Sequence, residues 1–447
     1  MNSIHLKKGL SPKIAGAPSQ HIRMLDTPRH VGMVPERIPF IKPRLLVEEN
    51  DVVSIGSPLF EDKRNPRIRF VSPGGGQVTR IAFGPRRIIQ NIIITLDDDE
   101  KAASVDVPKT DQILQMSRSR LVEILLAGGM WPFLRVLPFM DIADPDIIPP
   151  AVIVRLGDNE PFGPTPSIYL EGREKTFAVG IDLLKALCDR VVINITGDQA
   201  ILESLPQCAD TQQFTGNYPS GHPGYQLYRT KKGPEQNRTW YIDGQEVALL
   251  GEFIHSGSYP TRRIMSVGGS LAPDAGHVDA RAGAPLRQLC AGPISGNPAV
   301  RYIVGGVFSG FTGHADSFMG FYQNALNVLD EGDREEFLGF IRPGYGKPSN
   351  STAFLSAIRR RPFPMDCGQH GEIRACVNCG YCAKVCPVDI LPQFTMKCLV
   401  ADEVEEALAH GLLDCIECGL CTYVCPSKIE LREALRKAKA QYYKETA

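Results

Sequence analysis

Two short cysteine-rich blocks near the end of the chain constrain its fold more than any other feature. Each block carries four cysteines in the spacing C-x2-C-x2-C-x3-C followed by proline. This spacing suits thiolates that wrap one 4Fe–4S cubane, while the fourth thiolate of each block reaches the other cluster. We expect the first cluster to be held by Cys376, Cys379, Cys382 and Cys425. We expect the second cluster to be held by Cys415, Cys418, Cys421 and Cys386.

A zinc site is the alternative for these cysteines. Structural zinc normally takes two C-x2-C pairs, and two equal blocks of four cysteines would be an unusual way to supply them. Gly380 and Gly419 follow the second cysteine of each block, where a bulky side chain could crowd a cluster. Residues 395–410, between the blocks, have the apolar spacing of a helix. Cys398 lies on this helix, and we interpret it as a packed free thiol.

Length and composition limit the number of domains, the class of partner and the cellular compartment that fit this chain. A length of 447 residues predicts about three domains. Lys and Arg number 49 against 50 Asp and Glu, so nothing favours nucleic acid as a partner. No run of 18 apolar residues and no signal-peptide core occurs, so we expect a cytoplasmic chain that can sit peripherally on a membrane complex. Thirteen cysteines in such a compartment favour metal ligation over disulfides.

The rest of the chain alternates between β-rich and α/β patterns. Short β-branched runs broken by turns fill residues 1 to about 100, and a helical pattern covers residues 110–130. A strand at 151–154, a helix at 177–188 and a strand at 191–195 indicate a βαβ unit with a parallel sheet. Residues 262–330 return to short strands. Four prolines between residues 341 and 365 indicate a linker.

Lys63 is the position to consider for a covalently attached group. Residues 45–78 resemble the barrel-sandwich fold of biotinyl and lipoyl domains, which carry a modified lysine on an exposed hairpin tip. Lys63 lies near the corresponding place. Its neighbours, residues 61–66, do not form the usual modification motif, so we interpret this unit as structural.

Several segments resemble a known family of redox-complex proteins. The end of the chain, including residues 386–393 (CPVDILPQ) and 425–429 (CPSKI), resembles the RnfC component of the Rnf electron-transport complex. Residues 6–10 (LKKGL), 14–20 (IAGAPSQ), 59–66 (LFEDKRNP) and 72–78 resemble the NqrA component of the sodium-pumping NADH:quinone oxidoreductase. These two components are homologous, and the resemblance extends over nearly the whole chain.

The resemblance implies a multidomain α+β architecture. It implies a barrel-sandwich domain over residues 1–105, a Rossmann-like α/β domain over 106–258 and a β-grasp domain of the soluble-ligand-binding type over 259–345. Residues 346–447 would form a linker and an α-helical ferredoxin domain with two 4Fe–4S clusters. The helix expected at 430–444 is charged, and we interpret it as mostly solvated or as a contact for a partner.

Two departures from these families bear on function. Typical NqrA proteins keep only remnants of the cysteine region, whereas all eight ligands are present here, so this chain should carry electrons. RnfC has a Gly-rich loop and an acidic, cysteine-containing segment that serve FMN and NADH. Neither is found here, and residues 158–162 are a remnant of the second. The Gly-rich stretch at Gly305, Gly306, Gly310 and Gly313 is interpreted as turns rather than as a nucleotide site.

The sequence thus predicts a subunit of a membrane-bound, ion-pumping NADH:quinone or NADH:ferredoxin oxidoreductase, peripheral on the inner face of the cell membrane through its partner subunits. It would relay electrons through two 4Fe–4S clusters to or from a quinone, flavin or ferredoxin. One alternative is an NADH-oxidising, FMN-containing subunit of the Rnf type. Another is a docking and assembly module with structural clusters. His222 could donate a hydrogen bond to a quinone carbonyl, or could simply belong to a structural loop.

Overall fold

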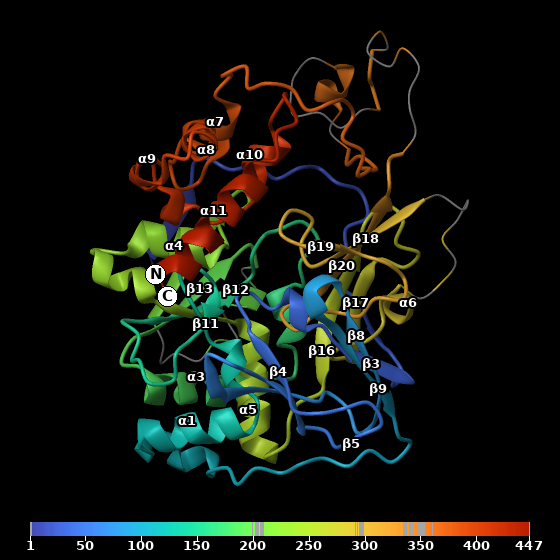
Figure 1. Ribbon diagram of the computed structural model, residues 1–447, viewed down its shortest axis with the longest axis vertical. Coiled ribbons are helices and arrows are strands. Elements are labelled where there is room, and N and C mark those ends of the chain that lie inside the picture. The colour runs from blue at the N-terminus through green and yellow to red at the C-terminus, as the bar shows by residue number, and fades with distance from the viewer. Residues whose placement is uncertain are drawn as a thin grey trace.

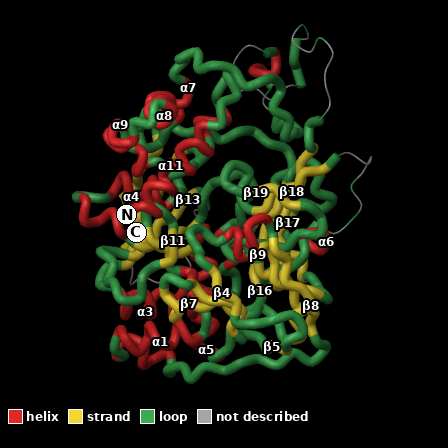
Figure 2. Tube along the Cα trace, in the orientation of Figure 1, coloured by secondary structure: helices red, strands yellow, loops and turns green. Residues whose placement is uncertain are grey.

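The structure is a computed structural model that describes residues 2–446 except 199, 202–204, 206–209, 291, 293, 295–298, 334–337, 339–340, 342, 347–353 and 360. In this part of the chain the strands form four sheets. Most helices gather on one side of the molecule and the strands of the β-rich units on the other (Figure 2). In the view of Figure 1 the N-terminus and the C-terminal helix α11 (Leu431–Thr446) both appear near α4 (Pro223–Thr230).

The N-terminal unit combines two small antiparallel sheets. The four-stranded sheet has the order β3-β9-β8-β5 and the three-stranded sheet the order β4-β6-β7. Phe60 and Phe70 are fully buried and stack with their ring centroids 4.7 Å apart, so they belong to the main hydrophobic core. The strands are β3 (His30–Met33), β4 (Pro43–Leu45), β5 (Val52–Val53), β6 (Pro58–Asp62), β7 (Asn65–Val71), β8 (Gly76–Phe83) and β9 (Ile89–Leu96).

The tip of the β6–β7 hairpin is fastened to the neighbouring domain. Arg64 pairs with Asp62 at 2.6 Å and with Asp141 at 2.5 Å, and both carboxylates are buried. Lys63 directly precedes this anchor. The hairpin tip therefore has a structural contact of its own.

The central sheet has seven strands in the order β1-β14-β13-β12-β15-β10-β11. The five neighbouring strands β1, β14, β13, β12 and β15 run parallel to one another. At one edge of the sheet β10 pairs antiparallel with β15, and β11 pairs antiparallel with β10. The sequence predicted β12 and β13, with the helix between them, as a βαβ unit, and this is confirmed. The strands are β1 (Asn2–Leu6), β10 (Arg135–Val136), β11 (Asp141–Ile142), β12 (Val152–Leu156), β13 (Val191–Thr196), β14 (Asp210–Gly216) and β15 (Trp240–Asp243).

Two helices of this domain approach each other unusually closely. They are α3 (Glu174–Leu187) and α5 (Gly244–Ser256). A Cβ atom on Gly180 would lie 2.1 Å from the carbonyl oxygen of Val247, and one on Gly251 would lie 1.8 Å from that of Thr176. Neither distance is compatible with a side chain. The two glycines thus set the spacing of the helices, since each lets the opposite backbone come near.

The third unit is a mixed six-stranded sheet with the order β19-β18-β20-β16-β17-β2. It has its own small core, in which Met265, Val278, Leu326 and Val328 are buried. The short helix α6 (Leu286–Leu289) also contributes to this core. The strands are β2 (Ile22–Met24), β16 (Arg262–Gly268), β17 (Gly276–Arg281), β18 (Val300–Val304), β19 (Phe311–Gly313) and β20 (Ala325–Asp330).

The first two strands differ from the sequence-based layout. We expected residues 1–105 to form one domain, but β1 pairs with β14 of the central sheet and β2 pairs with β17 of the six-stranded sheet. Both pairings satisfy backbone groups at what would otherwise be open sheet edges. The N-terminal segment therefore links three units.

The cysteine region is helical, as predicted, although its helices are shorter. The helix expected at 395–410 is wrong as a single element, because Asp402 has a positive φ of 61° that ends one helix before the next begins. The helix expected at 110–130 is likewise split at Ser117, whose side chain caps the second part. The helices of the cysteine region before α11 are α7 (Tyr381–Val385), α8 (Pro392–Val400), α9 (Val404–Ala409) and α10 (Leu420–Tyr423). Two further helices, α1 (Arg118–Ala127) and α2 (Pro166–Tyr169), belong to the α/β domain.

The C-terminal helix α11 also departs from expectation. We interpreted it as mostly solvated, but one face is docked, with Leu431, Leu435 and Lys439 buried. Much of the predicted linker at 341–365 lies outside the described residues. Among the helices that the structure describes, none is long and apolar enough to cross a membrane.

The close helix contact gives a stability prediction. Gly251→Ala should lower the free energy of unfolding by about 1–3 kcal/mol, because the new methyl group must push α5 away from α3. The effect is measured by denaturant unfolding. Gly346→Ala is the control, since a Cβ atom there meets nothing within 4 Å. Equal stability of the two variants would contradict this explanation.

Candidate functional site

The first predicted set of cysteines lines one small cavity. Cys376, Cys379, Cys382 and Cys425 surround it, together with Gln393, Pro426 and Leu431. Cys425 comes from the second block, so the structure brings together the two blocks in the crossed arrangement that the spacing indicates. Cys379 is exposed and Cys382 is buried. This set therefore lies near the protein surface.

The second predicted set lies deeper. Cys386 and Cys415 are buried in a core with Leu6 and Phe214 of the central sheet. Burial raises the pKa of Cys415 to about 11, and the neighbouring Cys386 adds to the effect. Burial also raises the pKa of Cys421 well above its usual value, with Cys415 and Cys418 acting in the same direction. The four sulfur atoms are thus close enough to influence one another.

These donor sets fit iron–sulfur clusters. A bound metal centre holds its cysteine ligands as thiolates, which a buried thiol otherwise resists. The first set offers four thiols around one cavity, and the second offers the buried Cys386 and Cys415 with the half-buried Cys418 and Cys421, so each set has the four thiols that a cubane takes. Among the described residues no three His, Cys, Asp or Glu side chains lie close enough together to hold a single metal ion.

The two blocks also repeat each other in backbone conformation. Gly380 and Gly419 have φ values of 76° and 80°, and each precedes a short helix. The positive φ is one physical reason for glycine at both positions, because other residues adopt this conformation at a cost. A Cβ on Gly419 would also lie 3.2 Å from the carbonyl oxygen of Phe308, whereas one on Gly380 would meet no protein atom within 4 Å. That a larger side chain would crowd a cluster stays a prediction. Asn378 and Glu417, two residues before them, are also left-handed, with φ values of 54° and 59°.

A cavity of about 1350 Å³ adjoins the second set of cysteines. Gly157 and Asp243 line it at the carboxyl ends of β12 and β15, where the strand order of the central sheet reverses. Open parallel sheets bind ligands at this position. Cys418 lines the same cavity, so it joins the sheet to the cysteine blocks. Sequence reasoning missed this cavity, because its signal is the strand order, which no local pattern reveals.

Charged side chains from the central sheet line the cavity. Arg155 Nε lies 2.5 Å from Asp243 Oδ1, and Arg135 Nη2 lies 3.1 Å from Asp243 Oδ2. Burial opposes ionisation of Asp243, but the two arginines outweigh it and hold its pKa below the usual range. Burial raises the pKa of Glu246 to about 7, since Arg135 compensates only in part. Asp243 and Glu246 form the capping box of α5, so this helix N-terminus is already occupied by acidic side chains.

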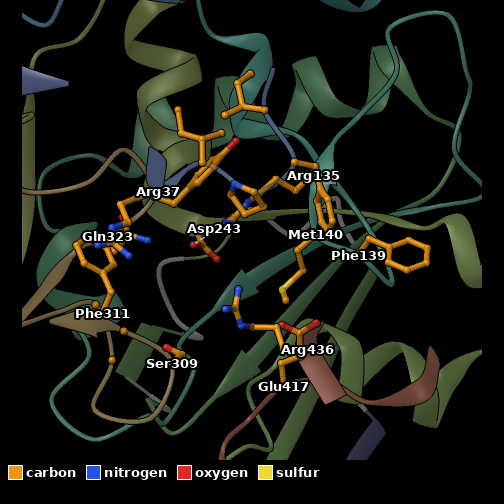
Figure 3. Close-up of a pocket in the computed structure, with 18 of the residues that line it drawn as sticks. Arg37, Arg135, Phe139, Met140, Asp243, Ser309, Phe311, Gln323, Glu417 and Arg436 are labelled. Carbon is orange, nitrogen blue, oxygen red and sulfur yellow. Dashed lines mark hydrogen bonds and ion pairs between the residues drawn. The ribbon is translucent and has the colours of Figure 1, made fainter. Parts of the chain in front are cut away.

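Other cavity groups lack partners of their own. Arg135 Nε, Gln323 Oε1 and Asn324 Oδ1 are buried without a hydrogen bond in the described structure. All three residues line the cavity. Figure 3 shows Gln323 beside Arg37 and Phe311 on one side, with Glu417 and Arg436 on the other.

Two segments noted in the sequence meet at the rim of this cavity. The buried carboxylate of Glu160 accepts hydrogen bonds from the backbone of Phe308 at 2.7 Å and of Ser309 at 2.8 Å. The Gly-rich stretch around Gly306 therefore forms a loop that is clamped to the α/β domain. Phe308 in turn stacks on Tyr218, whose hydroxyl donates to the carbonyl of Cys418 at 2.9 Å.

His222 lies in the cavity wall and has a structural contact. Its Nδ1 accepts a hydrogen bond from the backbone N–H of Gly224 at 3.1 Å and so caps α4. Burial, assisted by the nearby Arg155, lowers the pKa of His222 to about 3, so the ring is neutral. Because His222 lines the cavity, both interpretations of this residue stay open.

Family models divide the chain into recognised parts. Residues 4–97 match the NqrA N-terminal barrel-sandwich hybrid domain, residues 116–259 the NqrA second alpha/beta domain and residues 375–429 a 4Fe-4S dicluster domain. The prediction of a multidomain α+β protein with a barrel-sandwich domain, an α/β domain and a C-terminal ferredoxin domain is thereby confirmed. One solved structure, an NAD+-reducing [NiFe]-hydrogenase, aligns at 14% identity over 50% of this chain and 47% of its own, with a TM-score of 0.34.

Whole-chain relatives agree with these matches. The NqrA protein of the Na(+)-translocating NADH-quinone reductase of Tolumonas auensis is 33% identical, and the alignment covers 92% of each chain. The NqrA protein of Rhodopirellula baltica is 31% identical over 92% of this chain and 91% of its own. The chain therefore belongs to the NqrA family, whose members are subunits of the Na+-translocating NADH-quinone reductase.

Proposed function

We propose that this chain is an electron-transfer subunit of a Na+-translocating NADH:quinone oxidoreductase and relays electrons through two 4Fe–4S clusters. The observation that supports this most directly is the cavity that Cys376, Cys379 and Cys382 share with Cys425. In two-cluster ferredoxins the fourth cysteine of each block ligates the other cluster, and this crossed set has that arrangement. Cys386, Cys415, Cys418 and Cys421 would hold the second cluster.

The protein residues would position the clusters and control their access. When bound, each cluster takes up and releases one electron at a time. The set with the exposed Cys379 faces solvent and suits exchange with a partner protein. The set with Cys418 adjoins the interior cavity and suits exchange with a small carrier there. The chain would thus connect its interior to its surface.

The family also suggests partners and location. The other subunits of the membrane-bound complex would be the partners, and they would carry the sodium transport. The chain would sit on the inner face of the membrane through these subunits, since none of its described helices is suited to span it. Quinone, flavin or ferredoxin remain the candidate redox partners.

The finer fold assignments belong to the same proposal. We infer a Rossmann-like domain over residues 106–258, because β14, β13, β12 and β15 follow the order typical of half a dinucleotide-binding sheet. We infer a β-grasp domain of the soluble-ligand-binding type over residues 259–345 from its mixed sheet. The domains over residues 1–105 and 346–447 complete the layout, with β1 and β2 extending the neighbouring sheets.

A second candidate function has one observation in its favour. The cavity of about 1350 Å³ at the carboxyl ends of β12 and β15 is where open parallel sheets bind ligands, and it would suit a planar carrier such as a flavin. An NADH-oxidising, FMN-containing subunit would need such a site. The turn after β12 argues against it, because residues 157–163 lack the G-x-G-x-x-G spacing that binds a phosphate after the first strand of such a sheet. The relay is therefore the better-supported function.

Removal of one ligand tests the relay. Cys376→Ala should lower the iron and sulfide content of the purified chain by about half, because one of two clusters loses a ligand. Electron transfer through the complex should fail as well. Cys398→Ala is the matched control, since this cysteine lies on α8 outside both blocks. Unchanged iron content in the Cys376 variant, or full activity with one cluster lost, would contradict the proposal.

A spectrum of the isolated chain distinguishes the two candidate functions. We expect dithionite to bleach the iron–sulfur absorbance under anaerobic conditions, and NADH alone to leave it unchanged, because the relay has no NADH site. Bleaching by NADH would instead establish the chain as the NADH-oxidising subunit. Flavin fluorescence of the protein after gentle purification provides a second measurement of the same alternative.

A further inference from the structure

One charged side chain is buried beside the second set of cysteines. Lys439 of α11 is 1% exposed. Its ammonium group donates to the carbonyl oxygen of Cys415 at 2.7 Å and to that of Pro138 at 2.9 Å, and it lies 3.2 Å from Glu417 Oε1. An ammonium has three N–H donors, and here three acceptors surround it. These contacts keep the charge of Lys439 inside the protein.

The position of this charge is unusual for a merely structural contact. A buried ion costs free energy that a well-packed apolar side chain would not. Other lysines of the same helix avoid this cost, as Lys437 does with a side chain that is 73% exposed. Glu417 balances Lys439 only in part, because its side chain retains 15% exposure to water whereas that of Lys439 retains 2%. The less shielded of the two charges is therefore the positive one.

We propose that Lys439 and Glu417 set the reduction potential of the second cluster, with Lys439 raising it and Glu417 lowering it. This inference rests on the proposed function, since it assumes a cluster at Cys386, Cys415, Cys418 and Cys421. Reduction adds one electron, and hence one negative charge, to the cluster. A buried ammonium next to Cys415 stabilises that added charge, and a carboxylate next to Cys418 opposes it.

Two other cations, Arg432 and Lys8, lie near the second set of cysteines, and both are more exposed to water than Lys439. Arg432 of α11 donates from Nε to the carbonyl of Glu417 at 2.8 Å, but its other contact faces the loop at Ser309. Lys8 lies on the Cys386 side and pairs with Asp389 at 2.6 Å, with side chains 39% and 53% exposed. Water screens such exposed pairs strongly. Lys439 would thus act on the cluster from a position that water does not reach, so its charge is screened less than those of the exposed pairs.

The test is an anaerobic redox titration of the full-length chain, with dithionite as reductant and the cluster signals followed by electron paramagnetic resonance. Lys439→Met should lower the ratio of reduced to oxidised second cluster about tenfold at a fixed potential, which equals about 59 mV for a one-electron couple. Glu417→Gln should shift the same wave in the opposite direction. Repeating both in the Cys376→Ala background identifies which wave belongs to the second cluster.

Matched variants separate the charge from its structural contacts. Lys437→Met removes an exposed charge from the same helix and should leave both waves in place. Lys439→Arg keeps the charge and should return the wave towards its wild-type position. Opposite shifts in the Lys439→Met and Glu417→Gln proteins support the inference, and equal or absent shifts overturn it.

Three further outcomes of the titration separate this inference from the proposed function. If Lys439→Met fails to assemble the second cluster, Glu417→Gln decides alone, because it leaves the hydrogen bond from Lys439 to Cys415 in place; an upward shift supports the inference and no shift overturns it. If the wild-type chain holds no clusters, the proposed function fails and this inference falls with it. Two clusters with unaltered potentials in the variants would overturn this inference and leave the relay intact.

Discussion

The packing between the edge of the central sheet and the cysteine region determines how this molecule can work. Leu6 of β1 and Phe214 of β14 share a core with Cys386, Cys415 and Leu435. This core forms only because the first strand of the chain adds itself to the sheet beside β14. It places the second cysteine set next to the carboxyl ends of the parallel strands. The cavity, the buried charges and the path from interior to surface all depend on that placement.

Several of the charged groups around the cavity are shielded from water. Arg135, Asp243 and Glu246 are buried, and Arg155 is half-buried. Each then needs a partner, because an unpaired charge in such a place destabilises a protein by about 3–5 kcal/mol. The network around Asp243 satisfies most of them. Arg135 Nε, Gln323 Oε1 and Asn324 Oδ1 have no hydrogen bond among the described residues, and these three residues line the cavity.

The two cysteine sets are built from one repeated motif but have unequal surroundings. The repeated left-handed residues show that both blocks adopt the same local backbone. The first set nevertheless includes the exposed Cys379, whereas the second has no exposed cysteine and two that are buried in the core, Cys386 and Cys415. Because exposure and nearby charge both influence cluster potentials, identical ligand sets can serve as unequal steps of a relay. The difference comes from what packs on each block, chiefly α11 and the central sheet.

The sequence by itself determined the chemistry of the cysteine blocks, the βαβ unit at β12 and β13, and the family. Each of these depends on residues that are close together in the chain or on motifs of fixed spacing. Only the tertiary structure revealed the cavity, the clamp by Glu160 and the buried Lys439. Glu160 meets Ser309, and Lys439 meets Pro138, across more than a hundred residues of chain. No local pattern encodes such contacts, because burial and strand order arise only when distant segments pack together.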